Sequence, residues 1–244
     1  MIDKVLLKKR FLRALFNYEK EAIIQRKMAQ DLLKALSFKD FYSRVLEIGA
    51  GTGLFTRKFV RSYRFDLYLA SDLLPACSLF FKELPVYFLA LDGESPPFKA
   101  ESFSLIVSNA TFQWFLKPQE SFLAFERLLI PEGILAFTSF GPETMKELGP
   151  KEKPAGLLKI EEILSLKPPG FDILETQIVK RVLYFENSRE ALKHIRNTGA
   201  MGYLKSCWSL PEIKKWSQKY ETLRTEKGLP LTFESILVVW RKKA

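Results

Sequence analysis

A glycine-rich segment, residues 45–53, has the residue types and spacing of a ligand-binding turn. An apolar run leads into three alternating glycines, Gly49, Gly51 and Gly53, and an amphipathic pattern follows them. Glycine accepts backbone dihedrals that other residues avoid, and it lets a ligand approach the main chain closely. A helix that begins after such a turn offers N–H groups without intrahelical partners. The pattern therefore predicts a strand, a tight turn and a helix, with a ligand at the turn.

The charge of Glu47, two residues before the first glycine, bears on the kind of ligand. A dinucleotide site has the spacing G-x-G-x-x-G and holds a pyrophosphate, which a carboxylate would repel. The spacing here is G-x-G-x-G, and Glu47 would suit a cationic ligand such as the amino group or sulfonium of S-adenosylmethionine. The segment resembles the first motif, E-x-G-x-G-x-G, of the class I S-adenosylmethionine-dependent methyltransferases. A nicotinamide-dependent oxidoreductase and a chance glycine-rich turn are the alternatives.

Acidic residues end the next two predicted strands. Asp72 closes an apolar run and could accept both hydroxyls of a ribose, or it could cap a helix that begins after it. Asp92 closes the following run. In the methyltransferases that the glycine segment resembles, an acid at this place binds the adenine amino group, because a carboxylate accepts hydrogen bonds from N–H donors. Leu73 and Gly93, beside these acids, belong to the same predicted cofactor site.

The fourth predicted strand ends at Asn109, at the edge where open α/β sheets bind ligands. We include Asn109 in the cofactor site. Enzymes that methylate the exocyclic amines of bases carry two prolines after such a residue, and this chain lacks them. Trp114, a little further on, could form the floor of a substrate pocket or could simply pack in the core.

The first 36 residues are expected to form a helical lid with a break near Asn17 and Tyr18. Tyr18 and Gln25 are two helical turns apart, so they could face the same way and contact the cofactor. The alternative is a helical cap in which the tyrosine only packs.

The order of predicted elements indicates an α/β fold. Strands alternate with helices five times, and two more strands follow, the last expected to be antiparallel. This order fits the Rossmann-like seven-stranded sheet of the methyltransferases, in a single domain of residues 1–244, with residues 186–228 as a helical substrate-binding insertion between strands six and seven. The predicted strands comprise residues 45–48, 67–72, 86–93, 102–109, 134–140, 173–184 and 233–240.

The composition limits the partners and the compartment. The hydrophobic content of 47% is ample for a core, and the two cysteines provide neither a metal spacing nor a disulfide framework. No signal peptide and no membrane-spanning run is recognisable, so a cytoplasmic protein without a metal is expected. The net charge of +10 has three possible explanations: an acidic protein partner, a nucleic-acid partner, or simply a basic surface in contact with solvent. No nucleic-acid-binding module is visible, and we expect neither nucleic acid nor membrane as a partner.

Over nearly its whole length the sequence resembles the malonyl-acyl-carrier-protein O-methyltransferases of biotin synthesis. The resemblance rests on the amino-terminal pattern with Tyr18 and Gln25, on Ser108-Asn109 before Gln113-Trp114, and on three longer segments. These segments are residues 137–148, residues 192–200 and residues 229–234. Two departures are Ala50, where cysteine is commoner, and Arg196, where lysine is expected. The resemblance implies methyl transfer from S-adenosylmethionine to the free carboxylate of a malonyl group carried by an acyl carrier protein, which is acidic.

The residues available for catalysis agree with such chemistry. A carboxylate is ionised at neutral pH, so its attack needs no general base and the single histidine, His194, is not required as one. Catalysis then consists mainly of alignment and exclusion of water. A cation or hydroxyl must hold the substrate carboxylate, and we predict Tyr18 and Arg196, with Lys193 behind them. Other acceptors for the methyl group, or an assembly or RNA-binding factor that kept the fold, are the remaining alternatives.

Overall fold

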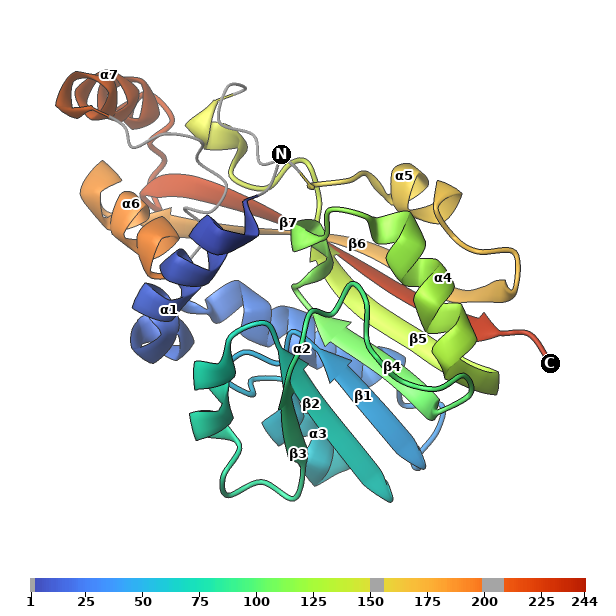
Figure 1. Cartoon of the computed structure of the whole chain (residues 1–244). Coiled ribbons are helices and arrows are strands. Elements are labelled where there is room, and N and C mark those ends of the chain that lie inside the picture. The colour runs from blue at the N-terminus through green and yellow to red at the C-terminus, as the bar shows by residue number, and fades with distance from the viewer. Residues whose placement is uncertain (1–2, 150–155, 199–208) are drawn as a thin grey trace.

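The computed structural model describes residues 3–149, 156–198 and 209–244, and the predicted motif residues Gly199 and Ala200 lie outside these ranges. Figure 1 shows a twisted sheet with helices on both faces and at one end. The strands are β1 (Arg44–Ile48), β2 (Leu67–Asp72), β3 (Tyr87–Ala90), β4 (Phe103–Asn109), β5 (Leu129–Phe140), β6 (Phe171–Phe185) and β7 (Leu229–Lys242). The helices are α1 (Lys4–Glu21), α2 (Ile23–Ala35), α3 (Thr56–Ser62), α4 (Pro118–Leu128), α5 (Ile160–Ser165), α6 (Ser188–Asn197) and α7 (Leu210–Glu221), with short 3₁₀ turns η1 (Pro75–Phe80), η2 (Phe112–Trp114) and η3 (Lys146–Leu148).

The sheet has seven strands in the order β3-β2-β1-β4-β5-β7-β6. Strands β1 to β5 pair in parallel, whereas β7 lies between β5 and β6 and is antiparallel to both. The seven-stranded sheet, its antiparallel last strand and the helical insertion between β6 and β7 are confirmed. Parallel strands end at the same edge, so the residues that follow β1, β2, β3 and β4 are brought together there.

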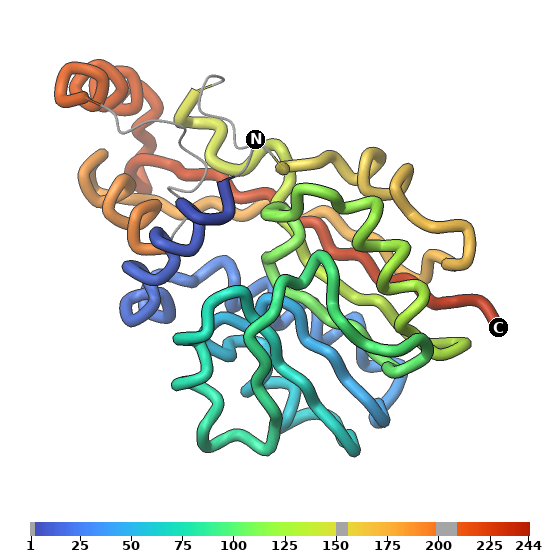
Figure 2. The backbone as a smooth tube through the Cα atoms, in the orientation of Figure 1, coloured from blue at the N-terminus to red at the C-terminus, as the bar shows by residue number. Residues whose placement is uncertain are grey.

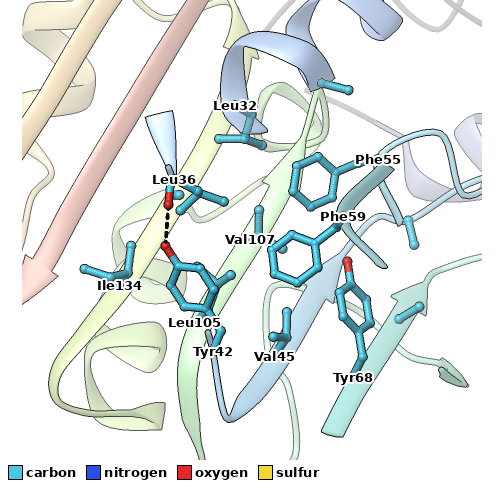
Figure 3. Packing of buried hydrophobic residues seen from close by; sticks show 14 of the residues in the cluster. Leu32, Leu36, Tyr42, Val45, Phe55, Phe59, Tyr68, Leu105, Val107 and Ile134 are labelled. Atoms are coloured by element: carbon cyan, nitrogen blue, oxygen red, sulfur yellow. Dashed lines mark hydrogen bonds between the residues drawn. The ribbon is translucent and has the colours of Figure 1, made fainter. Parts of the chain in front are cut away.

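The two faces of the sheet bury alternate residues of each strand. On β1, Val45 packs with α2 and α3, while its neighbour Leu46 packs on the opposite face with α4. Figure 3 shows the first face, where Phe55 and Phe59 lie against the strands and the Tyr42 hydroxyl donates to the Leu36 carbonyl oxygen at 2.9 Å. Both faces of the central parallel strands β1, β4 and β5 are thus covered, as their apolar sequences require, whereas the edge strand β3 is largely exposed.

A third apolar cluster joins the segments at the carboxyl end of the sheet. Leu7 of α1, Met28 of α2, Ile195 of α6 and Trp216 of α7 belong to it. Figures 1 and 2 show α1 beside α6, although the two are far apart in the sequence. No helix within the described ranges is long and apolar enough to cross a membrane.

Several boundaries differ from those predicted. The amino-terminal helices separate at Ala22, four residues after Tyr18, because the chain leaves the helical conformation there. The turn predicted at residues 131–133 lies inside β5, where Glu132 has a φ of +60° and the pairing with β4 shifts in register. Strand β7 begins at Leu229 rather than 233, since it continues pairing with β6 as far as Phe185.

Candidate functional site

The predicted glycine turn has the backbone conformation for which glycine is suited. Gly49, Gly51 and Gly53 have φ values of +70°, +55° and +81°. A Cβ on Gly49 would clash with the side chain of Thr111, whereas a Cβ on Gly51 would meet nothing within 4 Å. Gly49 therefore allows β1 and the segment after β4 to approach closely. Gly51 instead leaves open space, and both glycines line a pocket at the carboxyl edge of the sheet.

Asp72, at the end of β2, is tied to this turn through backbone hydrogen bonds. Its Oδ2 accepts from the Gly51 amide and its Oδ1 from the Leu74 amide, both at 2.9 Å. Burial raises the pKa of the Asp72 carboxyl, although the amide donors favour its charged form. Each carboxylate oxygen has a second lone pair, so Asp72 can still accept from a ligand in the pocket. It caps the turn after β2 and lines the pocket, so the two roles considered for it are compatible.

Asp92 lines the same pocket and is paired with the beginning of α1. Lys4 Nζ lies 2.7 Å from Asp92 Oδ2 and also contacts Glu94. Burial pushes the pKa of Asp92 upward, but the hydrogen bonds from Lys4 and from the Glu94 amide outweigh it, so the pKa lies below its ordinary value. Lys4 thus links the helix that covers the pocket to the segment that follows β3.

The segment after β4 completes the edge. The Asn109 side chain accepts from Thr138 Oγ1 at 2.8 Å and donates to the Gln25 carbonyl oxygen at 3.1 Å. Ala110 follows with a φ of +56°, a conformation that costs a residue with a Cβ free energy. Asn109, Ala110 and Trp114 line the pocket, and the Trp114 ring meets the Phe11 ring edge-on at 5.5 Å.

Glu47 lies behind the turn rather than in the pocket lining. Its Oε2 accepts hydrogen bonds from Thr56 Oγ1 and Tyr68 Oη, both at 2.6 Å. Burial raises the pKa of the Glu47 carboxyl to about 7, although these hydroxyl donors favour the charged form. A cationic ligand bound at the turn would lower this pKa again.

The remaining predicted residues divide between the pocket and the surface. Tyr18 on α1 lines the pocket, and burial raises the pKa of its hydroxyl, which keeps it protonated. Gln25 contributes only its backbone carbonyl to Asn109, because the break at Ala22 places it on a different helix from Tyr18. Leu73 and Gly93 line the pocket, whereas Gly53 lies just outside it.

Lys193 and Arg196 are exposed on α6 and do not belong to the pocket lining. The opposite face of α6 carries His194, whose Nδ1 lies 3.0 Å from Glu21 Oε2. Burial lowers the pKa of His194 more than Glu21 raises it, so the imidazole is neutral at neutral pH. The structure thus brings Tyr18, Asp72 and the glycine turn together, but it does not bring Arg196 to them.

Several pocket residues were not predicted. Lys4, Leu7, Phe11 and Leu15 line the pocket from the same face of α1 as the predicted Tyr18, and their helical spacing with Tyr18 was the signal for them. Thr111 has no local signal, because only the fold places it against Gly49. Thr52, in the glycine turn, lines the pocket, and its buried Oγ1 has no hydrogen-bond partner among the described residues.

An unpartnered buried hydroxyl and the open space beside Gly51 fit a polar ligand that approaches the main chain. The acidic residues at the strand ends can accept from its hydroxyl and amino groups. These features suit S-adenosylmethionine, whose ribose, adenine and cationic groups would meet Asp72, Asp92 and the charge of Glu47. Within the described ranges, no group of acidic, cysteine or histidine side chains could hold a metal ion.

Comparisons with known proteins agree with this geometry. The family model described as "Methyltransferase domain" matches residues 46–137. The chain is 31% identical to the malonyl-[acyl-carrier protein] O-methyltransferase of Chlorobium luteolum, over 100% of this chain and 97% of that protein. It is 33% identical to the protein of the same name from Chlorobium phaeovibrioides, over 99% and 97%. A solved structure from Bacillus halodurans shares the fold, with a TM-score of 0.64 at 18% identity over 88% of this chain and 100% of that one.

Proposed function

Because the chain belongs to the malonyl-[acyl-carrier protein] O-methyltransferase family, we propose that it methylates the free carboxylate of malonyl-acyl carrier protein. The product is the methyl ester, and the reaction is an early step of biotin synthesis. The observation that carries the proposal is the full-length similarity to these relatives, together with a pocket that adjoins the glycine turn.

S-adenosylmethionine, when bound, supplies an electrophilic methyl group next to a positive sulfur. In our proposal the chain holds this cofactor through the glycine turn, through Asp72 at the ribose and through Asp92 at the adenine. Thr52 gives its unpartnered hydroxyl to the same ligand. Glu47 adds negative charge behind the turn, where it favours a cation.

The substrate carboxylate needs to be held rather than activated. A malonyl carboxyl group is ionised at neutral pH, and the described pocket lining contains no histidine that could act as a base. The Tyr18 hydroxyl stays protonated and can donate to the carboxylate. Trp114 offers an apolar surface that excludes water from the reacting atoms.

A cation beside Tyr18 would offset the cost of removing the carboxylate from water. Within the described pocket lining the cations are Lys4 and Lys8, and Lys4 is engaged by Asp92 and Glu94. Lys8 is therefore our first candidate. Arg196 and Lys193 stay predictions for this role, and they would have to move from their exposed positions on α6 to perform it.

The experiment is the intact mass of malonyl-loaded acyl carrier protein after incubation with the protein and S-adenosylmethionine. The expected result is a gain of one methyl group on the malonyl carrier and none on an acetyl-loaded carrier. Malonyl-coenzyme A in a parallel reaction shows whether the carrier protein is required. Cofactor binding without methylation of any malonyl thioester would contradict the proposed acceptor and leave a methyltransferase of different specificity.

A further inference from the structure

The outward face of α1 is apolar where solvent would favour polar residues. Val5, Leu12 and Phe16 are 65%, 49% and 77% exposed. Their spacing places them on one side of the helix, with Lys9 between them. The opposite side of α1 lines the pocket with Leu7, Phe11 and Leu15 among others. A helix with both sides apolar is expected to have a partner on each. Within the described chain the exposed side has one ring contact, Phe16 with Phe80 at 6.3 Å between centroids, and Phe16 still remains 77% exposed.

Basic residues surround this apolar ridge. Lys8, Lys9, Arg13 and Lys20 are exposed on α1, and residues 4–18 contain no aspartate or glutamate. The first acidic residues after the ridge, Glu19 and Glu21, are turned to Arg57 and His194. The surface therefore has an apolar centre and a positive rim, which is the anatomy of an interface for a partner with acidic side chains around an apolar patch.

We propose that the outward face of α1 is the docking surface for the acyl carrier protein, an inference that rests on the proposed function. An α-helix with its side chains is about 10–12 Å across. A carrier on this face stands one helix width from the pocket, so its flexible arm enters alongside α1. Lys8 is both exposed and part of the pocket lining, which makes the docking face continuous with the pocket.

A basic helix with exposed apolar residues could also contact an anionic membrane surface. The geometry favours the carrier for two reasons. The ridge consists of few residues, and α1 is held to the body of the protein by Phe11 against Trp114 and by Glu21 against His194 and Asn197. The face also adjoins the pocket that must receive a carrier-bound group.

Two variants of α1 test the proposal without touching the pocket lining. One removes the ridge (Leu12→Ser with Phe16→Ser) and one reverses its charge (Lys9→Glu with Arg13→Glu). Their matched controls are Leu123→Ser on α4, a side chain as exposed as Leu12 at 49%, and Lys99→Glu before β4. Each protein is assayed with malonyl-acyl carrier protein and with malonyl-pantetheine, which has the thioester and no protein.

For each α1 variant, kcat/KM for the carrier should fall at least about tenfold, whereas kcat/KM for malonyl-pantetheine stays within about twofold. Binding of the unloaded carrier, measured by calorimetry, should weaken in parallel, and the controls should behave as wild type. Unchanged carrier kinetics and binding in both α1 variants would overturn the proposal. Equal losses on both substrates would do the same, since they indicate a structural role.

Two further measurements on the same variants distinguish other partners of the α1 face. Loss of binding to vesicles of equal phosphatidylglycerol and phosphatidylcholine, with carrier kinetics unchanged, would assign the face to a membrane. A change in sedimentation alone would assign it to a second copy of the chain. If the wild type methylates no malonyl thioester yet binds the carrier through α1, the proposed function fails and the docking surface stands. If malonyl-carrier methylation is unaffected by the α1 substitutions, the proposed function stands and the docking surface fails.

Discussion

The glycine-turn side of the pocket is held by backbone groups, whereas the α1 side is held by side-chain pairs. Asp72 accepts from the amides of Gly51 and Leu74, and the buried Ser108 hydroxyl donates to the Ile48 carbonyl oxygen at 2.7 Å. Helix α1 is held by ion pairs of Lys4 with Asp92 and of Glu19 with Arg57. Such partly exposed pairs contribute about 0–1 kcal/mol each.

The difference indicates how each side works. We call the glycine-turn side the floor of the pocket and the α1 side its cap. The floor is continuous with the sheet, so its geometry cannot change without disturbing the core. The ion pairs of the cap can break at little cost, whereas apolar contacts such as Phe11 against Trp114 keep α1 on the body of the protein. We therefore expect substitutions in the floor to affect stability and cofactor binding together, and substitutions in the cap to affect binding and turnover with little loss of stability.

The sharpest test of the floor compares two glycines of the same turn. Gly49→Ala combines a positive φ with a clash against Thr111, and it should lower the free energy of unfolding by about 3 kcal/mol or more. Gly51→Ala has the φ penalty alone and should cost about 1–2 kcal/mol. Urea denaturation measures both. Equal losses would mean that Thr111 moves aside and that the floor is less rigid than described.

The cap can be tested by asking which helix supplies the cation for the substrate carboxylate. Lys8→Ala should lower kcat/KM by about 10–100-fold, because a charge-assisted hydrogen bond in the transition state is lost. Arg196→Ala, on the exposed face of α6, should have a much smaller effect. Steady-state kinetics with malonyl-pantetheine exclude a contribution from carrier docking. The opposite ranking would support the sequence prediction for Arg196 and require α6 to move.

Glu47 makes cofactor binding to the floor dependent on pH. Its charged form should favour the cationic cofactor, so affinity should rise by about threefold to tenfold between pH 5.5 and 7.5 as the carboxyl ionises around its pKa of about 7. Tyr68→Phe removes a hydroxyl donor and should move this transition to higher pH. Tyr42→Phe, which loses a buried hydrogen bond to Leu36, is the control. Calorimetry at each pH provides the affinities, and Glu47→Gln should abolish the dependence.

The same carboxyl has an opposite effect on stability. Its folded pKa of about 7 lies above the ordinary 4.5, so the contribution to stability is fully present below about pH 4.5. It is lost as the pH rises through about 7. Urea denaturation at each pH gives the free energy of unfolding of wild type and of Glu47→Gln. The two values should therefore converge at low pH, and their dependences on pH should differ in slope between pH 5 and 7. Parallel curves would place the titration on another group.

The smallest expected effect concerns the Lys4 pair of the cap. Lys4→Gln should lower stability by less than about 1 kcal/mol at neutral pH. Asp92 has a depressed pKa, so its contribution to stability is present above pH 3.8 and lost as the pH falls through the folded value. The substitution should also free Asp92 Oδ2 and tighten cofactor binding by about twofold to threefold. Lys20→Gln, exposed on the same helix, is the control. Weaker cofactor binding in Lys4→Gln would instead mean that Lys4 contacts the cofactor directly.

The floor was largely predictable because its signals are local. The glycine spacing, the acid that ends β2 and the asparagine that ends β4 all follow from short patterns in the sequence, and Asp72, Asn109 and both lining glycines occur where expected. Parallel strands carry such residues to a common edge whatever the details of packing. The register of each strand follows from which of its alternate residues are apolar.

The cap was predictable as helices but not in its orientation. The break at Ala22 turns Gln25 away from the face of Tyr18, although their spacing in an unbroken helix would align them. Arg196 lies outward because His194 and Ile195 take the buried side of α6. The rotation of a helix about its axis depends on contacts with distant segments, such as Glu21 with His194. Short sequence patterns do not predict such contacts.

The position of β7 has a consequence for synthesis of the chain on the ribosome. Strand β6 pairs only with β7 in the described sheet, and β7 follows it after the α6–α7 insertion. Until residues 229–242 have emerged, β6 has no strand to pair with, and its backbone N–H and C=O groups lack their ladder partners. This interval is when the nascent chain is most open to aggregation and to capture by chaperones. A pause in translation between β6 and β7 would lengthen it.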